Sequence, residues 1–537
     1  MSTPLTVDAQ TYGLAGDGTT NDQPALAALV DELGAACATD GLPRRIMVPP
    51  GRYVILDQPV VWRSGVSLIG AGRGATCFVL GNPGRPSDPV PLAWFTAQKH
   101  GAGPENHLAD VAFAHFEIDA SGARTKEYDP LSKGIGLQYV LRGRFTDLYV
   151  HDAAATGFGC DFLQDTVVEA VLAERCGAQD PGEKMGGAGI GIGVGGWGNV
   201  ERLTVTACTA TGNGTNGIFL ELQQEEWTPP RGIRITACHV EDNRFGISDW
   251  GADGLLVANC TMLGNHEAGF DVSAQGTSGI GGRGGIVTGC VIDGNVRDGI
   301  GFGNTPGPYA FRGNRISDNG RYGYWEHNLA GGDQEPAVDV VLESNDIRGN
   351  ALDGVRVDAG LREPALLGNR FRNNGRRAAP DAAGGGDGVR YLARSVIDEH
   401  AGWPVDGHRG KRVTAGGQSA MVLRNTATEL VLAPCRPGAD SAWSQGTPPP
   451  GTAYRLPDSP APRAGLTAAA PVTRPHVHGN RFWDDQEPRT QSHAVWITAD
   501  GHWEGGRVTD NDFTGNADRS TRYDNAPQGG RWRDNET

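Results

Sequence analysis

Carboxylates and aromatic rings recur at matching places in a series of short segments that begin with glycine. In Gly217-Ile-Phe-Leu-Glu221 and Gly269-Phe-Asp-Val-Ser273, apolar residues alternate with other side chains. A β-strand sends successive side chains to opposite faces, so the apolar residues point inward and the others point outward. Carboxylates can move protons, and aromatic planes pack against the C–H faces of sugar rings. These residue types on one face predict a carbohydrate-binding groove with acid–base chemistry.

If the segments stack, their outward positions form two columns with glycines that leave room for a ligand. The first column reads Gly136, Gly159, Gly191, Phe219, Ser248, Asp271, Gly301, Trp325 and Arg356. The second column reads Gln138, Asp161, Gly193, Glu221, Trp250, Ser273, Gly303, His327 and Asp358. The residues expected to bind substrate are Phe219, Trp250, Trp325, His327, Arg356 and Asp358. The alternative is a solvated sheet face whose aromatic residues bind nothing.

The catalytic candidates are carboxylates in or beside these columns. Strands two coils apart are separated by about 10 Å, so Glu221 and Asp271 approach the separation of roughly 6.5 to 9.5 Å in inverting glycosidases. Asp249 stands where other segments place an apolar residue, and either burial or a local bulge that turns it outward fits this position. We expect Glu221 to act with Asp271 or Asp249, and Asp161 is a further candidate.

Two polar loops would wall this groove, Leu222–Pro230 and Ser273–Arg283. Insertions at one edge of a repeating structure often form its binding rim. Glu225 and Trp227 are therefore secondary substrate-binding candidates, although a solvated loop tip is the simpler account of them.

The elements that position these side chains are given by a repeat in which Cys or Asn is followed five residues later by Asn. Its period is about 22 to 31 residues, which is typical of one coil of a solenoid. Asparagine tolerates the left-handed conformation and its amide can bond the asparagine stacked above, so the ladder is structural. The pairs are Cys208/Asn213, Cys238/Asn243, Cys260/Asn265, Cys290/Asn295, Asn314/Asn319, Asn345/Asn350, Asn369/Asn374 and Asn511/Asn516.

The expected fold is all-β, a single-stranded right-handed parallel β-helix with an N-terminal capping helix and a small β-hairpin insertion near the C-terminus. The helix is expected over Pro24 to Ala36, with Asn21 or Asp22 as its cap. The expected parts are an N-terminal cap with the first coils at 1–72, the β-helix at 73–403, the β insertion at 404–456, a Pro/Ala linker at 457–475, final coils at 476–520 and a loose tail at 521–537.

Composition limits the partners. The net charge of −16 repels a phosphate backbone, so we expect no nucleic-acid partner. No apolar stretch is long enough to span a membrane, and no signal peptide is visible, so we expect a cytoplasmic or a released, phage-associated protein. None of the nine cysteines forms a CxxC pair, and we expect no cofactor, with calcium neither indicated nor excluded.

The N-terminal stretch Tyr12-Gly-Leu-Ala-Gly-Asp-Gly-Thr-Thr-Asn-Asp22 resembles the opening of the pectate-lyase-like superfamily. That superfamily includes family 28-like glycosidases, alginate epimerases and phage tailspikes, so the resemblance implies the β-helix but not one reaction. Thr156–Gln164 resembles the epimerase signature YGxDPH, with Phe158 at the tyrosine and Leu163 at the catalytic histidine. These replacements argue against epimerase chemistry. A pectate-lyase base would have to be Arg356 or Lys184.

Three functions follow as hypotheses. The first is a carbohydrate-active enzyme, a glycoside hydrolase or intramolecular glycosyltransferase, that acts on a neutral or weakly charged glycan with two carboxylates. The second is a tailspike-like glycan recognition protein or depolymerase. The third is a polysaccharide lyase, epimerase or other tailoring enzyme. The expected partner is an oligo- or polysaccharide, and the chain is expected to be a monomer or a homotrimer.

Overall fold

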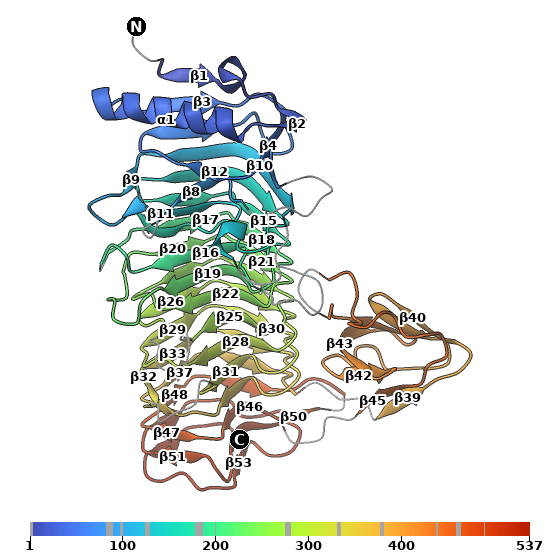
Figure 1. The fold of residues 1–537 in the computed structure, drawn as a ribbon. Helices are drawn as coiled ribbons and strands as arrows, with labels where there is room; N and C mark the ends of the chain where they lie inside the picture. The colour runs from blue at the N-terminus through green and yellow to red at the C-terminus, as the bar shows by residue number, and fades with distance from the viewer. Residues whose placement is uncertain are drawn as a thin grey trace. The chain divides into compact units, whose positions relative to one another are not determined.

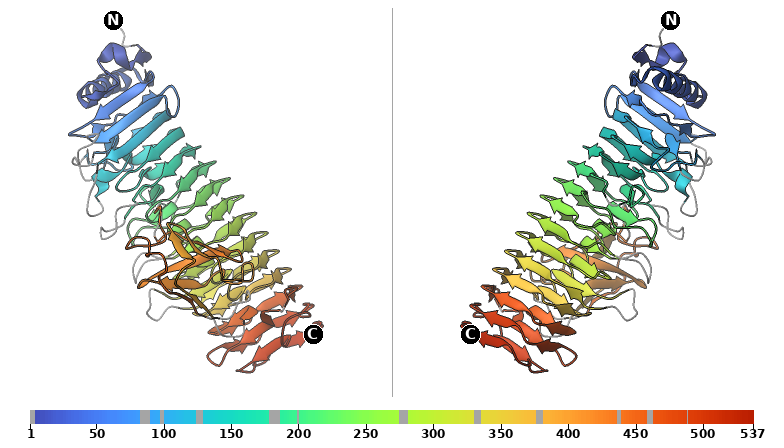
Figure 2. Two further views of the ribbon diagram at one scale, coloured as in Figure 1. Left: turned by 90° about the vertical axis from the view of Figure 1, so that its right-hand side faces the viewer. Right: turned by 90° about the vertical axis from the view of Figure 1, so that its left-hand side faces the viewer.

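The computed structural model describes residues 4–81, 90–96, 100–123, 129–177, 186–198, 200–273, 281–329, 335–375, 381–435, 439–457, 463–487 and 489–537. Within them the chain is an all-β protein with long parallel sheets, as the sequence predicts (Figure 1). It divides into two compact units, residues 1–243 with 247–260, and residues 244–246 with 261–537. In each unit the strands stack as successive rungs (Figure 2).

The first unit begins with the predicted capping helix. Helix α1 (Gln23–Asp40) buries Leu26, Leu29 and Leu33 and packs on strands β5 (Val60–Val61) and β6 (Val66–Ile69). Asp22 precedes the helix, but its carboxylate accepts hydrogen bonds from the backbone N–H groups of Ala15 (2.5 Å) and Gly16 (3.3 Å). It therefore ties the preceding loop to the helix start and makes no side-chain cap bond.

Parallel pairing joins the successive coils of the first unit. Besides β5 and β6, the strands that precede β11 in the sequence are β1 (Thr6–Asp8), β2 (Asp17–Asn21), β3 (Arg44–Met47), β4 (Gly51–Ile55), β7 (Thr76–Gly81), β8 (Ala93–Phe95), β9 (Leu108–Ala109) and β10 (Ala112–Gly122). One set of stacked strands comprises β12 (Arg144–His151), β14 (Val167–Glu169), β15 (Leu172–Glu174), β17 (Thr204–Thr206), β18 (Thr209–Thr211), β20 (Arg234–Thr236), β21 (His239–Glu241) and β23 (Leu256–Ala258). The face with the predicted columns comprises β11 (Gly136–Leu141), β13 (Asp161–Gln164), β16 (Ile190–Val194), β19 (Asn216–Leu222) and β22 (Phe245–Trp250).

The second unit continues the pattern with a parallel sheet whose register aligns the predicted columns. Asp271 pairs with Gly301, Gly301 with Trp325, and Trp325 with Arg356, so these four residues form one column as predicted. The sheet comprises β25 (Ala268–Val272), β28 (Asp298–Gly303), β31 (Tyr324–His327), β35 (Val355–Val357), β46 (Arg463–Ala468), β50 (Gln491–Ile497) and β53 (Thr521–Tyr523).

The remaining coil strands of the second unit form the other sides of the solenoid. One stacked set comprises β24 (Thr261–Leu263), β26 (Gly285–Thr288), β27 (Val291–Asp293), β29 (Tyr309–Arg312), β30 (Arg315–Ser317), β33 (Val340–Glu343), β34 (Asp346–Arg348), β37 (Ala365–Leu367), β38 (Arg370–Arg372), β48 (His476–His478), β49 (Arg481–Trp483), β52 (Arg507–Thr509) and β54 (Arg531–Arg533). A smaller sheet comprises β32 (Ala337–Val338), β36 (Leu361–Arg362), β47 (Pro471–Thr473) and β51 (His502–Glu504).

The predicted asparagine ladder is present inside the second unit. The Nδ2 of Asn265 donates to Oδ1 of Asn295 (3.0 Å), and the same bond links Asn295 to Asn319 (2.9 Å) and Asn319 to Asn350 (2.8 Å). These side chains are buried, and each bond satisfies polar groups that would otherwise be orphaned. The ladder therefore fixes the register between coils.

An antiparallel sheet with its own core interrupts the second unit. It comprises β39 (Ala382–Gly384), β40 (Val389–Leu392), β41 (Ser395–Asp398), β42 (Arg412–Ala415), β43 (Gln418–Asn425), β44 (Glu429–Leu432) and β45 (Tyr454–Leu456). It begins at Ala382 and so includes residues that the sequence assigns to the β-helix before 404. The alternation in β40 and β41 resembles that of a coil strand, and only the antiparallel partners distinguish the two.

Two other boundaries differ from the prediction. Residues 457–475, expected as a linker, contain β46 and β47, which pair with β35 and β36 as part of a coil. Residues 521–537, expected as a loose tail, contain β53 and β54, which pair with β50 and β52. Proline, alanine and polar residues dominate these segments, but a few inward side chains such as Leu466 and Val472 suffice for a coil. Among the described residues, no helix is both long and apolar enough to cross a membrane.

Candidate functional site

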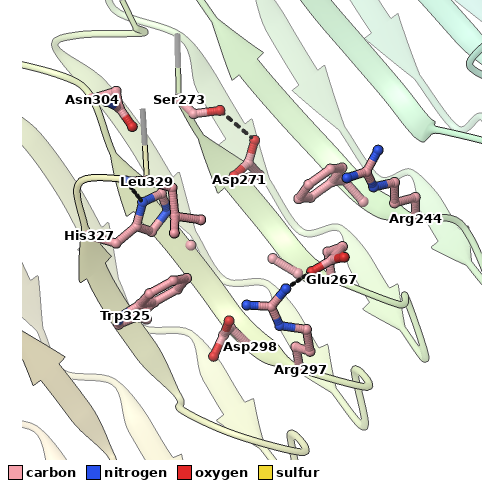
Figure 3. Close-up of a pocket in the computed structure, with 13 residues that line it drawn as sticks. Arg244, Glu267, Asp271, Ser273, Arg297, Asp298, Asn304, Trp325, His327 and Leu329 are labelled. Carbon is pink, nitrogen blue, oxygen red and sulfur yellow. Dashed lines mark hydrogen bonds and ion pairs between the residues drawn. The ribbon is translucent and has the colours of Figure 1, made fainter. Parts of the chain in front are cut away.

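A cavity of about 480 Å³ opens on the outer face of β25, β28 and β31, entirely within the second unit (Figure 3). It contains three carboxylates, two arginines, a histidine and a tryptophan, which is a dense set of polar and aromatic groups for its size. Its lining is Arg244, Phe245, Glu267, Ala268, Asp271, Ser273, Arg297, Asp298, Gly301, Asn304, Trp325, His327 and Leu329.

Gly301 leaves space in the middle of this cavity. A carbon atom at the position of a side-chain Cβ on Gly301 would lie 3.4 Å from Oδ1 of Asp271 and 3.7 Å from Nε2 of His327. The Asp271 carboxylate and the His327 imidazole therefore border the same gap, and a ligand seated over Gly301 would face both groups. The glycine has an ordinary backbone conformation here, so it serves to keep this volume open.

Asp271 is held on the strand β25 and is nearly buried, with 4% of its surface exposed. Its Oδ2 accepts a hydrogen bond from the Ser273 hydroxyl (3.1 Å), two residues along on the same face of the chain. That bond orients the carboxylate so that Oδ1 is the oxygen beside the open volume above Gly301. Asp271 can accept a proton or a sugar hydroxyl at this position.

His327 is neutral at physiological pH. Burial lowers the pKa of its imidazole to about 4, and the positive charges of Arg321 and Arg297 act in the same direction. Its Nδ1 accepts a hydrogen bond from the backbone N–H of Leu329 (3.4 Å), which assigns the ring proton to Nε2. The site thus places an N–H donor on His327 opposite an acceptor on Asp271.

Trp325 is fixed by polar neighbours. Its Nε1 donates to Oδ2 of Asp358 (2.8 Å), whose Oδ1 accepts from Nε of Arg356 (2.7 Å). The guanidinium of Arg321 lies 3.9 Å from the ring centroid, and the His327 ring lies 4.3 Å away. The predicted residues Trp325 and His327 line the cavity, while Arg356 and Asp358 hold Trp325 in place.

Charged residues that the sequence prediction missed form the rim. Arg297 is ion-paired with Glu267, and Arg321 holds both oxygens of Asp298 (2.9 and 2.6 Å). Burial raises the pKa of Asp298 in spite of that arginine. These residues lie between the second asparagine of each repeat and the glycine that starts the strand. A charged residue recurs at this place in successive repeats, and this recurrence is the sequence signal that could have predicted the rim. They form a turn column because the backbone N–H of Arg321 bonds the carbonyl of Arg297.

The predicted residues of the first unit form a different and more open group. Phe219 and Trp250 meet edge to face with ring centroids 5.0 Å apart, and both are half-buried. Glu221, also half-buried, accepts a hydrogen bond from Nε2 of Gln223 (3.0 Å). Trp227 packs against Phe162 (5.4 Å). Glu225 is exposed in the loop that follows Glu221.

Two of the predicted carboxylates are engaged by the protein itself. Asp249 is fully buried, and its Oδ1 accepts from the backbone N–H groups of Gly251 (3.3 Å) and Ala252 (2.9 Å). Asp161 accepts from the N–H of Gly193 (2.8 Å) and lies 3.4 Å from Nζ of Lys133. Both carboxylates therefore have structural partners that hold turns and neighbouring strands together.

A buried glutamate beside the cavity has a similar structural role. Glu326 faces inward, accepts from the N–H groups of Ala359 (2.8 Å) and Gly360 (3.0 Å), and has its pKa raised by burial to about 7. Residues 274–280 of the predicted groove loop and Lys184 lie outside the described residues. Among the described residues, no group of three or more His, Cys, Asp or Glu side chains is arranged to hold a metal ion.

Two family models match the chain. Residues 183–332 match the right-handed β-helix region, and residues 6–82 match the family described as rhamnogalacturonase A/epimerase, pectate lyase-like. The second match covers the N-terminal motif from Tyr12 to Asp22, so the resemblance given by the sequence is confirmed. The chain is a right-handed parallel β-helix protein with a pectate-lyase-like N-terminal segment.

Individual relatives are distant. Depolymerase 1, capsule KN3-specific, of Klebsiella phage KN3-1 is 26% identical over 189 residues, which are 34% of this chain and 22% of that relative. Among solved structures, the Dettilon tailspike protein has a TM-score of 0.48 at 13% identity, covering 84% of this chain and 94% of that one. The A-module of Azotobacter vinelandii mannuronan C-5 epimerase AlgE4 has a TM-score of 0.38 at 14% identity, covering 99% and 97%.

Proposed function

We propose that this chain is a polysaccharide-cleaving enzyme that binds its glycan in the cavity on β25, β28 and β31. The observation that carries the proposal is the gap over Gly301, where a side-chain Cβ would lie 3.4 Å from Asp271 Oδ1 and 3.7 Å from His327 Nε2, so that both groups border one open volume. A sugar hydroxyl, a glycosidic oxygen or a water in this gap would meet a proton acceptor and a donor together. The capsule-specific depolymerase among the relatives supports the same substrate class.

In this proposal Asp271 is the catalytic carboxylate that takes a proton in the reaction. His327 has a pKa of about 4, so at neutral pH it donates a hydrogen bond from Nε2 and positions a substrate oxygen. The rigid ring of Trp325 supplies an apolar surface for a sugar ring at the cavity wall. Asp298 is the second carboxylate. Arg321 binds both of its oxygens (2.9 and 2.6 Å), so in this proposal Asp298 gives a proton only after it leaves that ion pair, when burial, which raises its pKa, favours the protonated form.

The second candidate function is glycan recognition without cleavage. It is favoured by one observation, because Arg297 and Arg321 hold Glu267 and Asp298, so the cavity's acids are largely engaged in ion pairs. In that case Asp271 and His327 would only bind sugar hydroxyls, and the chain would retain the polymer without shortening it.

The test is a panel of bacterial capsular polysaccharides incubated with the wild type, with Asp271→Asn and with Asp524→Asn. Asp524 is the control carboxylate: it follows β53 of the same sheet, accepts from Trp496 and Arg522 and lies outside the cavity lining. Loss of a general acid–base group lowers the rate by about 10² to 10⁴. Products are followed by polymer size and reducing ends, and absorbance of unsaturated uronates reports elimination.

We expect at least one polymer to be shortened by the wild type and by Asp524→Asn, and hardly at all by Asp271→Asn. Equal product formation by all three proteins would reject the role of Asp271. Binding by the wild type with no shortening of any polymer would favour the recognition function, and a rise in unsaturated products would assign a lyase.

A further inference from the structure

A second hollow lies on another side of the second unit, on strands β48, β52 and β54. The register pairs His476 with Arg507 and Arg507 with Arg531, and the middle residues of the same strands, such as Val477 and Val508, are buried. Side chains alternate along a strand, so His476, Arg507 and Arg531 share the outer face. The hollow has a volume of about 290 Å³ and is lined by His476, His478, Arg507, Thr509, Asp510, Arg531 and Arg533, which we call the arginine hollow.

The charges in the arginine hollow are poorly compensated. Within the part of the chain that the structure describes, neither Arg507 nor Arg531 has a carboxylate partner. Other coil arginines are stacked against an acid of a neighbouring coil, among them Arg481 with Asp512 (3.0 Å) and Arg312 with Glu343 (3.1 Å). Neighbouring strands are about 4.8 Å apart, so two unpaired guanidinium groups in one column repel each other.

The acids near the hollow do not reverse this balance. Asp510 accepts from His478 Nδ1 (3.2 Å), and Asp534 lies 3.4 Å from Nε of Arg533. Among the described residues, Arg507 and Arg531 thus remain two exposed arginines without an ion pair, in a protein with a net charge of −16. The imidazoles of His476 and His478 and the hydroxyl of Thr509 add further groups that can bond oxygen atoms.

We propose that the arginine hollow binds the anionic groups, carboxylate or sulfate, of an acidic polysaccharide. Two guanidinium forks on adjacent strands can each bond a planar oxyanion bidentately. The proposal rests on the proposed function for the polymer class, and it changes the expected glycan from neutral to acidic. The glycan is favoured over a nucleic acid because the proposed function already places a polysaccharide on this solenoid. A nucleic acid, which like polygalacturonate carries a charge at every step, is the alternative that the DNA competitor tests.

The test measures binding of polygalacturonate to the full chain by isothermal calorimetry at low and moderate salt, with dextran as the uncharged polymer. Arg507→Gln/Arg531→Gln is compared with Arg312→Gln/Arg481→Gln, which removes the same charge from ion-paired arginines. The parent protein and both double variants also carry Asp271→Asn, so that cleavage does not consume the polymer. A single-stranded DNA oligonucleotide and inorganic sulfate serve as competitors.

We expect the hollow variant to bind polygalacturonate at least tenfold more weakly, the paired-arginine variant within about twofold of its parent, and salt to weaken binding. Sulfate should compete and dextran should not bind at this site. Equal affinity in all variants, absence of polygalacturonate binding by the parent, or stronger binding of DNA than of polygalacturonate would each overturn the proposal. Because binding is measured without turnover, the result for the arginine hollow does not depend on whether Asp271 takes part in cleavage.

Discussion

The inside and the outside of the second unit's coils use the same repeat in opposite ways. Inside, the ladder from Asn265 to Asn350 places the same amide in every coil, and each side chain bonds the next. Outside, the matching positions on β25, β28 and β31 are occupied by Asp271, Gly301 and Trp325. Repetition supplies register and stability, whereas a change of residue from coil to coil makes a cavity. Variants in the two regions should therefore separate stability from activity.

The largest expected effect is on the ladder. Asn319→Ala removes the acceptor for the N–H (3.1 Å) and the Nδ2 (2.9 Å) of Asn295 and the donor to Asn350 (2.8 Å). Buried groups left without a partner cost about 1 to 3 kcal/mol each, so the free energy of unfolding should fall by about 4 kcal/mol. Urea unfolding measures this.

The control for the ladder is Asn525→Ala, which removes one half-buried bond to the carbonyl of Gly501 and should cost about 1 kcal/mol. At temperatures well below unfolding, Asn319→Ala should keep most of its cleavage rate. A stability loss no larger than that of Asn525→Ala would contradict the structural role of the ladder.

His327 should make stability depend on pH. The folded protein keeps its imidazole neutral down to a pKa of about 4, whereas in the unfolded chain it is protonated near pH 6.5. The unfolded state therefore binds the extra proton between these values, and stability falls by up to about 3 kcal/mol as the pH drops through this window. His327→Gln should lack this component. The measurement is the difference in urea unfolding between the two proteins at pH 7 and pH 4.5.

Glu326 titrates in both proteins of that pair, so its own contribution is common to them. A difference between wild type and His327→Gln that stays constant from pH 7 to pH 4.5 would show that the imidazole is not held in its neutral form.

A smaller effect is expected from the aromatic wall. Trp325→Ala should raise KM about tenfold with a smaller change in kcat, since a rigid ring contributes binding surface and takes no part in proton transfer. Trp496→Ala is the matched control, because Trp496 lies on the same sheet, bonds Asp524 (2.9 Å) and is covered by Arg522. Steady-state kinetics on the polymer that the wild type cleaves measure KM and kcat for both variants. Equal changes in the two would show that Trp325 is not part of the substrate-binding surface.

The smallest effect is expected at the outward group of the first unit. Glu221→Gln should change the cleavage rate less than threefold, because Glu221 is half-buried, bonds Gln223 and lies outside the cavity lining. The rate is measured beside that of Asp271→Asn. A hundredfold loss of cleavage rate in Glu221→Gln would support the sequence-based prediction that Glu221 is catalytic, and would place the catalytic centre in the first unit.

The sequence predicts the parts of the molecule that obey a strict period. The strand alternation places Asp271, Trp325, His327 and Arg356 on one face, and the asparagine spacing predicts the ladder. Both predictions depend only on which residues repeat. The N-terminal capping helix follows in the same way from its local apolar pattern.

The rest depends on contacts that periodicity does not encode. Whether Asp249 turns outward is decided by the backbone groups of Gly251 and Ala252, which bind it in the interior. Glu267 and Arg297 lie at the cavity rim, in the turns before the strands, where the alternation of strand residues does not predict which way a side chain points. The start of the antiparallel sheet at Ala382 depends on its pairing with Leu456, more than seventy residues later in the sequence.

That pairing has a consequence for how the chain assembles. The ladder step from Asn369 to Asn480 joins residues 111 apart, whereas the steps before it join residues 24, 30 or 31 apart. Closing a loop costs about 0.6 kcal/mol for each doubling of its length, so this step costs about 1 kcal/mol more while the insertion is unfolded. Because β39 pairs with β45, the folded insertion holds its two ends side by side and shortens the effective loop. Growth of the solenoid should therefore pause at this point, and the last coils should form after the insertion has folded.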